Sequence, residues 1–433
     1  MNKNSYFPYI VQTTKRWGIR VFLYQTMQRD IKIVKMHKKS KNYWTFMLKC
    51  TNIELTVKRN KKQEGNKRMK GNVIVGQSGG PTAAINASLA GVYRTAKDRG
   101  ANKVYGMLHG IQGLLKEKYI DLSDHIKTEL DAELLKRTPA AFLGSCRYKL
   151  PEIHENREVY DKIFEILDKL DIEAFIYIGG NDSMDTVDKM SKYCKENGVD
   201  DVFVVGAPKT IDNDLWGTDM TFGFQSAVNI ATECIDCIHT TAASHGRVFI
   251  VEVMGHKVGW LTLNAGMAGG ADIILIPEIP YDIDKVVAAI NDRHKKGSKF
   301  TILAVAEGAI SKEDAKLSKK EYKEKMKNYK FPSVSYELAA QIQERTGQEV
   351  RVTVPGHTQR GGSPCPYDRV FASRLGAEAG ELILKGEYGF MVGYKNREVV
   401  KVPLEDVAGK LKMVSPDASI IREAKHLGIS FGD

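Results

Sequence analysis

Two glycine-rich segments of this sequence have the residue types and the position to bind phosphate groups. Residues 76–82 follow an apolar run and precede a helical pattern, and residues 179–183 repeat that order. Glycines between a strand and a helix let backbone N–H groups approach an anion, and the helix dipole favours negative charge there. A tight turn with packing glycines explains either segment alone. Two such junctions in one sheet favour a polyphosphate ligand.

A third segment, residues 208–214, places Lys209 beside the carboxylates of Asp212 and Asp214 in one short turn. Carboxylates next to a phosphate site repel the ligand unless they bind a metal ion or accept a proton. Phosphoryl transfer needs both functions, a base for the attacking hydroxyl and acidic groups that hold Mg²⁺. A structural turn rich in Asp and Asn explains this composition but not its position after a strand.

Further along the chain, Arg247, His256, Glu307, Arg351 and Arg360 lie close to glycines or strand ends. Arginine pairs with phosphate oxygens and a carboxylate binds ring hydroxyls, so this set suits a sugar phosphate. Taken singly, each arginine is more often a surface residue.

The elements that must position these segments show the alternation of a parallel α/β sheet. From Gly71 onward, short β-branched runs alternate with longer helical patterns. Near-continuous apolar runs are typical of strands covered on both faces. We predict strands at residues 72–76, 103–107, 174–178, 202–206, 247–253, 272–276, 300–306 and 351–354, with a solvated helical insertion at residues 311–330.

Length and charge distribution narrow the class of protein. The 433 residues suffice for two or three domains. The formal charge is +11, but residues 1–68 carry 17 Lys and Arg against three acidic residues, which leaves residues 69–433 at −3. No run of about 18 apolar residues predicts a membrane span. Six cysteines are too few for a disulfide framework. We therefore expect a cytoplasmic protein without membrane or nucleic-acid partners.

Residues 1–68 show no sustained period of 2 or 3.6, and they allow three interpretations. They form a basic arm that binds a polyanion, a disordered tail, or a stretch absent from the native protein because translation starts at Met69. We favour the third interpretation, because Met69 directly precedes the first predicted strand. Cys234 and Cys237 fall within a helical pattern at residues 226–240, where we expect buried core cysteines and no metal site.

In this order and at these spacings, the segments resemble the phosphofructokinase family over nearly all of residues 71–395. The motifs are Ser-Gly-Gly at 78–80, a GGD-type loop at 179–183, TIDND at 210–214, a Met-Gly loop at 254–256 and GHxQRGG at 356–362. The resemblance implies an α/β fold of two Rossmann-like, three-layer lobes with mostly parallel sheets. The phosphoryl-donor lobe would span 69–224 and 359–400, the sugar-phosphate lobe 225–358, and a C-terminal segment 401–433.

The resemblance is closest to the pyrophosphate-dependent branch because of two residues. At both positions, ATP-using relatives generally have glycine. The carboxylate of Asp182 takes the space and charge that a nucleotide α-phosphate needs. The ammonium of Lys209 compensates diphosphate charge and stabilises the leaving phosphate. The implied reaction is diphosphate plus fructose 6-phosphate giving phosphate plus fructose 1,6-bisphosphate, in both directions and with Mg²⁺. The alternatives are an ATP-dependent 6-phosphofructokinase and a silent regulatory subunit that binds sugar phosphate.

The resemblance also implies residue roles. Asp212 is the expected general base, Thr210 and Asp214 orient substrate and base, and Lys209 and Asp182 complete the catalytic group. The diphosphate ligands are Gly79, Gly80, Arg147 and Lys209. The sugar phosphate contacts are Thr210, Asp212, Asp214, Met254, Gly255, His256, Glu307, His357 and Arg360. Arg247 and Arg351 would reach a neighbouring subunit's site, which implies a homodimer or homotetramer.

The sequence departs from the family pattern at two of these positions. Asn181 stands where the family commonly has a Mg²⁺-binding aspartate, so the metal would also rely on phosphate oxygens, water, Asp212 or Asp214. His256 replaces an arginine, which removes a permanent charge and makes sugar binding sensitive to pH.

Overall fold

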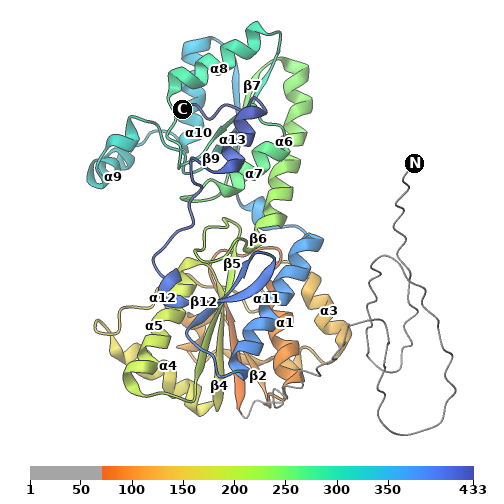
Figure 1. Cartoon of the computed structure of the whole chain (residues 1–433), viewed down its shortest axis with the longest axis vertical. Helices are drawn as coiled ribbons and strands as arrows, with labels where there is room; N and C mark the ends of the chain where they lie inside the picture. The colour runs from red at the N-terminus through yellow and green to blue at the C-terminus, as the bar shows by residue number, and fades with distance from the viewer. Residues whose placement is uncertain (1–70) are drawn as a thin grey trace, which may run out of the picture. The chain divides into compact units, whose positions relative to one another are not determined.

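The computed structural model describes residues 71–433, and the basic segment 1–68 lies outside them. The described chain builds two sheets (Figure 1). The eight-stranded sheet has the order β12-β11-β5-β4-β1-β2-β3, with β6 beside β5. Its strands are β1 (Asn72–Gln77), β2 (Val104–Met107), β3 (Tyr119–Asp121), β4 (Ile172–Gly179), β5 (Phe203–Thr210), β6 (Phe222–Gly223), β11 (Phe390–Lys395) and β12 (Glu398–Pro403). The four-stranded sheet has the order β10-β7-β9-β8, formed by β7 (Val248–Val253), β8 (Ile273–Leu275), β9 (Thr301–Ala306) and β10 (Val350–Thr353).

Parallel pairing dominates both sheets. Strands β2, β1, β4, β5 and β11 are parallel, while β3 and β12 add antiparallel edges. The smaller sheet is entirely parallel. The predicted α/β class with mostly parallel sheets is therefore confirmed, and each of the eight predicted strands is present. The hairpin β11–β12 was missed because its turn uses Asn396 and Arg397, both with positive φ, without the glycine that usually marks such a turn.

Helices cover both faces of each sheet. The alternation along β1 directs Val73 and Val75 to one core and Ile74 to the other, so the sheet is the middle of three layers. The helices of the larger lobe are α1 (Ile85–Asp98), α2 (Gly110–Leu114), α3 (Glu129–Arg137), α4 (Arg157–Lys169), α5 (Asn181–Asn197), α11 (Pro366–Leu384) and α12 (Leu404–Val407). Those of the smaller lobe are α6 (Phe224–His245), α7 (Trp260–Ala268), α8 (Ile283–Lys295), α9 (Lys319–Lys327), α10 (Val334–Thr346) and α13 (Ser419–His426).

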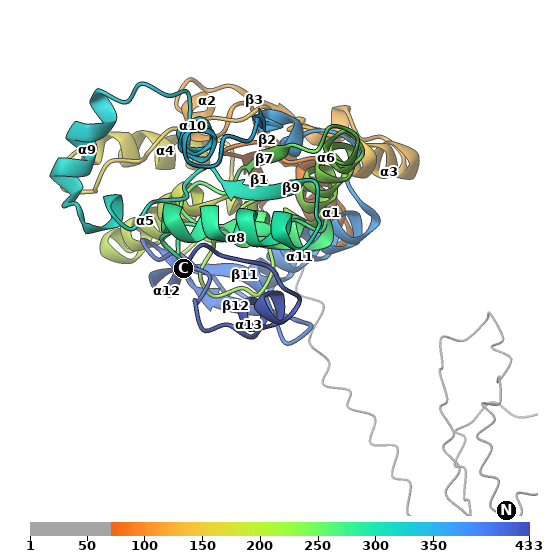
Figure 2. The ribbon, with the colours of Figure 1, turned by 90° about the horizontal axis from the view of Figure 1, so that it is seen from above.

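Two sequence expectations outside the sheets have different outcomes. Helix α9 lies away from the sheets in both views and buries none of its residues, as expected for the insertion at 311–330 (Figures 1 and 2). The expectation that Cys234 and Cys237 are buried is wrong, because Cys234 is half-buried and Cys237 is exposed on α6. In residues 71–433 no helix combines the length and apolar character needed to cross a bilayer.

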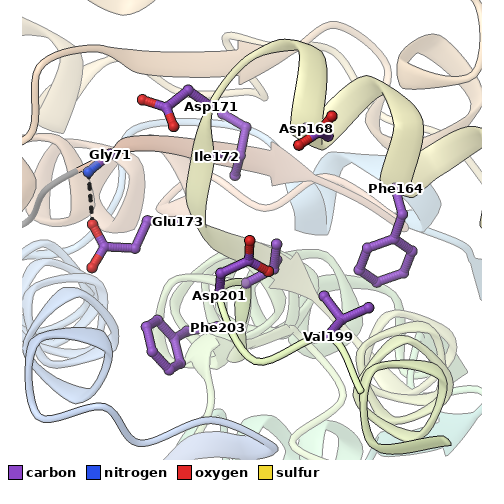
Figure 3. A pocket seen from close by; sticks show the side chains of 10 residues that line it. Gly71, Phe164, Asp168, Asp171, Ile172, Glu173, Val199, Asp201 and Phe203 are labelled. Carbon is purple, nitrogen blue, oxygen red and sulfur yellow. Dashed lines mark hydrogen bonds between the residues drawn. The ribbon is translucent and has the colours of Figure 1, made fainter. Parts of the chain in front are cut away.

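A hollow of about 490 Å³ opens at the amino ends of β4 and β5. It is lined by apolar side chains such as Phe164 and Phe203 and by acidic ones such as Asp168 and Asp201 (Figure 3). The Gly71 amide donates a hydrogen bond to Glu173 there. This hollow lies at the sheet edge opposite to the glycine-rich segments, so it does not contribute to their site.

Helices α1 and α11 pack closely because each carries a glycine that faces the backbone of the other helix. A Cβ on Gly91 would lie 2.3 Å from the Ser373 carbonyl oxygen, and one on Gly376 would lie 2.1 Å from the Ser88 carbonyl oxygen. We predict that Gly91→Ala lowers the free energy of unfolding by about 2–4 kcal/mol, although alanine favours an isolated helix by about 1 kcal/mol. Urea denaturation measures the change.

The matched control is Asp98→Ala, an exposed position on α1 itself, which should change the free energy of unfolding by less than about 0.5 kcal/mol. A Gly91→Ala protein that is more stable than the native one would show that the helices can separate without cost.

Candidate active site

The three segments singled out in the sequence meet at the carboxyl edge of the larger sheet. Gln77 of β1 pairs with Ile178 of β4, and Gly179 of β4 pairs with Pro208 of β5. Because these strands are parallel, residues 78–80, 180–183 and 209–214 all begin beyond the same edge. Ligands of open α/β sheets bind in this position.

The first glycine loop is fixed by hydrogen bonds to the segment that carries Arg147. The Gly79 amide donates to the Cys146 carbonyl at 3.0 Å, and the Ser145 hydroxyl donates to the Gly79 carbonyl at 2.5 Å. Gly79 has φ of 78°, which favours glycine. Arg147 is exposed beside this loop. The loop and the arginine are therefore held next to one another.

Two cations lie against Gly80. The Lys209 ammonium donates to the Gly80 carbonyl at 2.7 Å, and a Cβ on Gly80 would lie 2.9 Å from Cζ of Arg360. Any side chain at this position would displace the guanidinium. The structure thus joins the first glycine loop, the TIDND segment and the GHxQRGG segment in one cluster.

Lys209 is only 2% exposed. This burial lowers the pKa of the ammonium to about 7, and the positive charge of Arg360 acts in the same direction, while Asp212 and Asp214 oppose it. A bound anion would therefore favour the protonated, fully charged form of Lys209.

Asp212 has the properties of a general base. Burial, followed by the charge of Asp214, raises the pKa of Asp212 to about 7. Its Oδ1 is buried without a hydrogen-bond partner, and its backbone amide donates to Thr210 Oγ1 at 3.0 Å. A carboxyl whose pKa lies near neutrality, with an unpaired oxygen, can accept a proton from a bound hydroxyl.

Asn181 and Asp214 form a second polar pair at the edge of the sheet. The Asn181 Nδ2 donates to Asp214 Oδ2 at 2.7 Å, which leaves the Asn181 Oδ1 as an acceptor. Asp214 Oδ1 is buried and has no partner, and burial raises the pKa of this carboxyl. No cluster of three or more His, Cys, Asp and Glu side chains suited to a metal occurs in residues 71–433. The oxygens of Asn181 and Asp214 nevertheless fit a hard cation that takes its other ligands from phosphate and water.

Asp182 occupies the first turn of α5 at the mouth of this site. Its carboxylate is exposed and pairs with Lys149, with Nζ and Oδ1 3.1 Å apart. It lies one residue beyond Asn181 and carries its negative charge toward solvent.

The loops of the smaller sheet bring the expected sugar ligands together. The Gly255 and His256 amides donate to Glu307 Oε1, at 3.3 and 2.8 Å. His256 has φ of 51°, and a Cβ on Gly308 would lie 2.1 Å from its carbonyl oxygen. The charge of Glu307 also contributes to the raised pKa of Asp212, after burial and the charge of Asp214, so this loop lies on the side of the TIDND turn.

The 3₁₀ helix η3 (Gly356–Arg360) completes this face. Its His357 is exposed, and its Arg360 reaches Gly80 as described above. Gln359 is buried, and its side chain accepts from the Met254 amide at 3.2 Å and donates to the Gly356 carbonyl at 3.1 Å. Gln359 therefore connects η3 to the Met-Gly loop, a role that the sequence pattern did not predict.

Arg247 and Arg351 are not part of this cluster within the chain. Both pair with Glu349, and Arg247 lies at the amino end of β7, while Met254 follows its carboxyl end. The strand between them is about 20 Å long. Any role of these arginines in a sugar-phosphate site must therefore lie outside this chain's own cluster.

Two further residues at the turn were not found from the sequence. Asn213 is 4% exposed, has φ of 54°, and its Oδ1 accepts from the Thr221 amide at 3.0 Å. Lys412, from the C-terminal segment, donates to the same Oδ1 at 2.9 Å. An Asn between two aspartates signals a turn. Nothing in the sequence connects it with a lysine about 200 residues away.

Comparison with known proteins relates most of the described chain to one family. Residues 72–383 match the family described as Phosphofructokinase. A protein of Spirochaeta thermophila named ATP-dependent 6-phosphofructokinase is 45% identical over 364 residues, covering 82% of this chain and 96% of its own. ATP-dependent 6-phosphofructokinase 3 of Bacteroides thetaiotaomicron is 40% identical, covering 82% and 98%.

Solved structures with the same fold carry a different description. The pyrophosphate-dependent phosphofructokinase of Nitrosospira multiformis superposes with a TM-score of 0.72 at 28% identity, covering 85% of this chain and 93% of its own. That of Marinobacter aquaeolei gives 0.69 at 29% identity, covering 83% and 92%. The printed names of the relatives therefore differ on the phosphoryl donor.

The raised pKa of Asp212 makes a prediction about stability in metal-free buffer. Its carboxyl ionises near pH 3.8 when unfolded but near 7 when folded, so a destabilising contribution develops as the pH rises from about 4 to 7. Asp212→Asn removes it. We expect this variant to gain about 1–3 kcal/mol in free energy of unfolding, relative to the native protein, between pH 4 and pH 8.

Urea denaturation at the two pH values measures this gain. The control is Asp200→Asn, an exposed position at the other end of β5, which should change the free energy of unfolding by less than about 0.5 kcal/mol. Equal effects of Asp212→Asn at both pH values would mean that the folded carboxyl ionises normally.

Proposed function

The chain belongs to the phosphofructokinase family of phosphotransferases, and on that premise we propose that it transfers a phosphoryl group from diphosphate to fructose 6-phosphate. The observation that carries the choice of donor is the buried ammonium of Lys209 on the Gly80 carbonyl. It puts a cation on the donor loop, where a donor without adenosine contacts needs one.

Asp182 supports the same donor from the other side of the site. Its carboxylate stands in the first turn of α5, next to the position proposed for the donor phosphates. A nucleotide would have to carry its third phosphate past this charge, whereas diphosphate ends before it. The pair Lys209 and Asp182 therefore attracts two phosphates and repels a third.

The transfer itself uses the groups of the TIDND turn. The unpaired Oδ1 of Asp212 takes the proton of the sugar 1-hydroxyl as its oxygen attacks the terminal phosphorus of diphosphate. The new O–P bond forms while the bond from phosphorus to the bridging oxygen breaks, and phosphate leaves. The charge on the leaving phosphate is stabilised by Lys209 and Arg147, with the Gly80 amide as a further ligand. The Gly79 amide already donates to the Cys146 carbonyl, so Gly79 would serve by shaping the loop.

Mg²⁺ belongs to this proposal, and Asn181 with Asp214 would hold it. Their two oxygens fit the cation described above, and donor phosphate oxygens supply the rest of its ligands. When bound, the ion neutralises phosphate charge. The hydrogen bond between Asn181 and Asp214 keeps both side chains directed to the same place.

The sugar phosphate would lie against the loops of the smaller sheet. Met254, Gly255, His256 and Glu307 line the sugar, and His357 and Arg360 contact its phosphorylated end. The pairing of Arg247 and Arg351 with Glu349 keeps both guanidinium groups together near the edge strand β10. We propose that they complete the sugar-phosphate site of a second subunit in a homodimer or homotetramer.

An ATP-dependent 6-phosphofructokinase is the second candidate, because the relatives of Spirochaeta thermophila and Bacteroides thetaiotaomicron carry that name. A silent subunit that only binds sugar phosphate has less support. Asn181 is its only argument, and the hydrogen bond from the Asp212 amide to Thr210 Oγ1 supports an active enzyme instead.

The donor is tested by initial rates on fructose 6-phosphate with Mg²⁺, comparing diphosphate with ATP. We expect activity with diphosphate, a rate with ATP at least about 100-fold lower, and loss of about 10³-fold or more in Asp212→Ala. Fructose 1,6-bisphosphate formation is the readout. Faster turnover with ATP would overturn the donor assignment, and no activity with either donor would favour the silent subunit.

Donor choice should move when its two determinants are changed. Asp182→Gly combined with Lys209→Gly should raise kcat/KM for ATP relative to diphosphate by about 10–100-fold, because repulsion falls and the compensating cation is lost. Asp182→Asn is the matched control, since it keeps the size of the side chain and removes its charge. An unchanged ratio in the double variant would contradict the assignment of these residues.

A further inference from the structure

The C-terminal segment reaches the TIDND turn through one side chain. The Lys412 ammonium donates to Asn213 Oδ1 at 2.9 Å, to the Thr218 carbonyl at 2.8 Å and to the Asp219 carbonyl at 3.0 Å. A lysine has three N–H donors, and all three are used here. They close the loop that follows the proposed base.

The same residue is fixed at its backbone by both lobes. Its amide donates to the Asp214 carbonyl at 2.8 Å, and its carbonyl accepts from Trp260 Nε1 of α7 at 2.8 Å. Leu411 forms a bridge to Leu215, and the Val414 amide donates to Glu278 at 2.9 Å. Segment 411–414 therefore connects the turn of the larger lobe with the smaller lobe.

Asn213 links Lys412 to the two aspartates of the turn. It lies between Asp212 and Asp214, and its left-handed backbone at φ 54° is sparsely populated by residues other than glycine. Such a conformation persists only where its surroundings hold it. Its Oδ1 accepts from Lys412 and from the Thr221 amide, so these two donors fix the residue that lies between Asp212 and Asp214, whose side chains are the two carboxylates.

We propose that Lys412 is a positioning residue of the phosphoryl-transfer site, which acts through Asn213 to hold Asp212 in its reactive orientation. The proposal rests on the proposed function. It adds a residue that lies beyond the part matched by the family, residues 72–383, and that does not touch the substrates. Burial lowers the pKa of Lys412 to about 8, so keeping an ammonium here has a cost that its three hydrogen bonds offset.

Lys412→Met tests this by removing the ammonium while keeping the length of the side chain. We expect kcat to fall at least about tenfold, because a small displacement of a base costs rate, while KM for fructose 6-phosphate changes less than about threefold. Lys412→Arg, which keeps charge and donors, should recover most of the loss. Lys410→Met is the control, since Lys410 is about half exposed and pairs only with Asp406, at 3.8 Å.

Amide hydrogen exchange across residues 210–221 provides a readout that needs no activity. Lys412→Met should accelerate exchange there, compared with Lys410→Met, even if the native enzyme proves inactive and the proposed function fails. Faster exchange with unchanged kcat in an active enzyme would overturn the positioning role. So would unchanged exchange, or equal losses of kcat in Lys412→Met and Lys410→Met.

Trp260→Phe covers the case in which Lys412→Met does not fold. It keeps an aromatic ring and removes the N–H that donates to the Lys412 carbonyl. We expect a several-fold fall in kcat at nearly constant KM, with faster exchange at the same turn. A protein with native kcat and native exchange would show that the segment is not needed to hold the base.

Discussion

Charge held out of water at one edge of a parallel sheet is the constraint on which the site depends. Lys209, Asp212 and Asp214 lie within six residues, and each is largely buried. Desolvation disfavours the charged form of each side chain. It lowers the pKa of Lys209 and raises that of Asp212, so that both lie at about 7. A bound phosphate would favour the charged form of Lys209, and a bound cation would favour the charged forms of the aspartates. Ligand binding would therefore offset the cost of burying these charges.

The glycines of both loops let the backbone lie close to neighbouring polar side chains. Gly80 has no room for a side chain beside Arg360, and its carbonyl accepts from Lys209. Gly179 has none either, because a Cβ there would lie 1.9 Å from the Ser183 hydroxyl. Packing of α1 against α11 through Gly91 and Gly376 keeps the sheet and its helices in the same close register.

The sequence predicted the strands and the site's main chemistry because both depend on local patterns. Apolar β-branched runs predicted β1, β2, β4 and β5 of the larger sheet and all four strands of the smaller one, and motif order predicted the clustering of residues 78–80, 180–183 and 209–214. The hairpin β11–β12 was not predicted, since Asn396 and Arg397 form its tight turn without glycine. Lys412 escaped for another reason: its partners Asn213, Thr218 and Asp219 are distant in sequence, and a lone lysine in a polar stretch has no pattern.

Lys412 lies in a segment that connects the two lobes. The proposed base belongs to the larger sheet, and the loops that face it, with Glu307 and His256, belong to the smaller one. A movement of one lobe relative to the other would separate the proposed sugar-phosphate contacts from the proposed base. Segment 411–414 opposes this, because Trp260 and Glu278 hold it on one side and Asp214 on the other. These hydrogen bonds therefore tie the turn that carries the proposed base to the smaller lobe, where the proposed sugar-phosphate contacts lie.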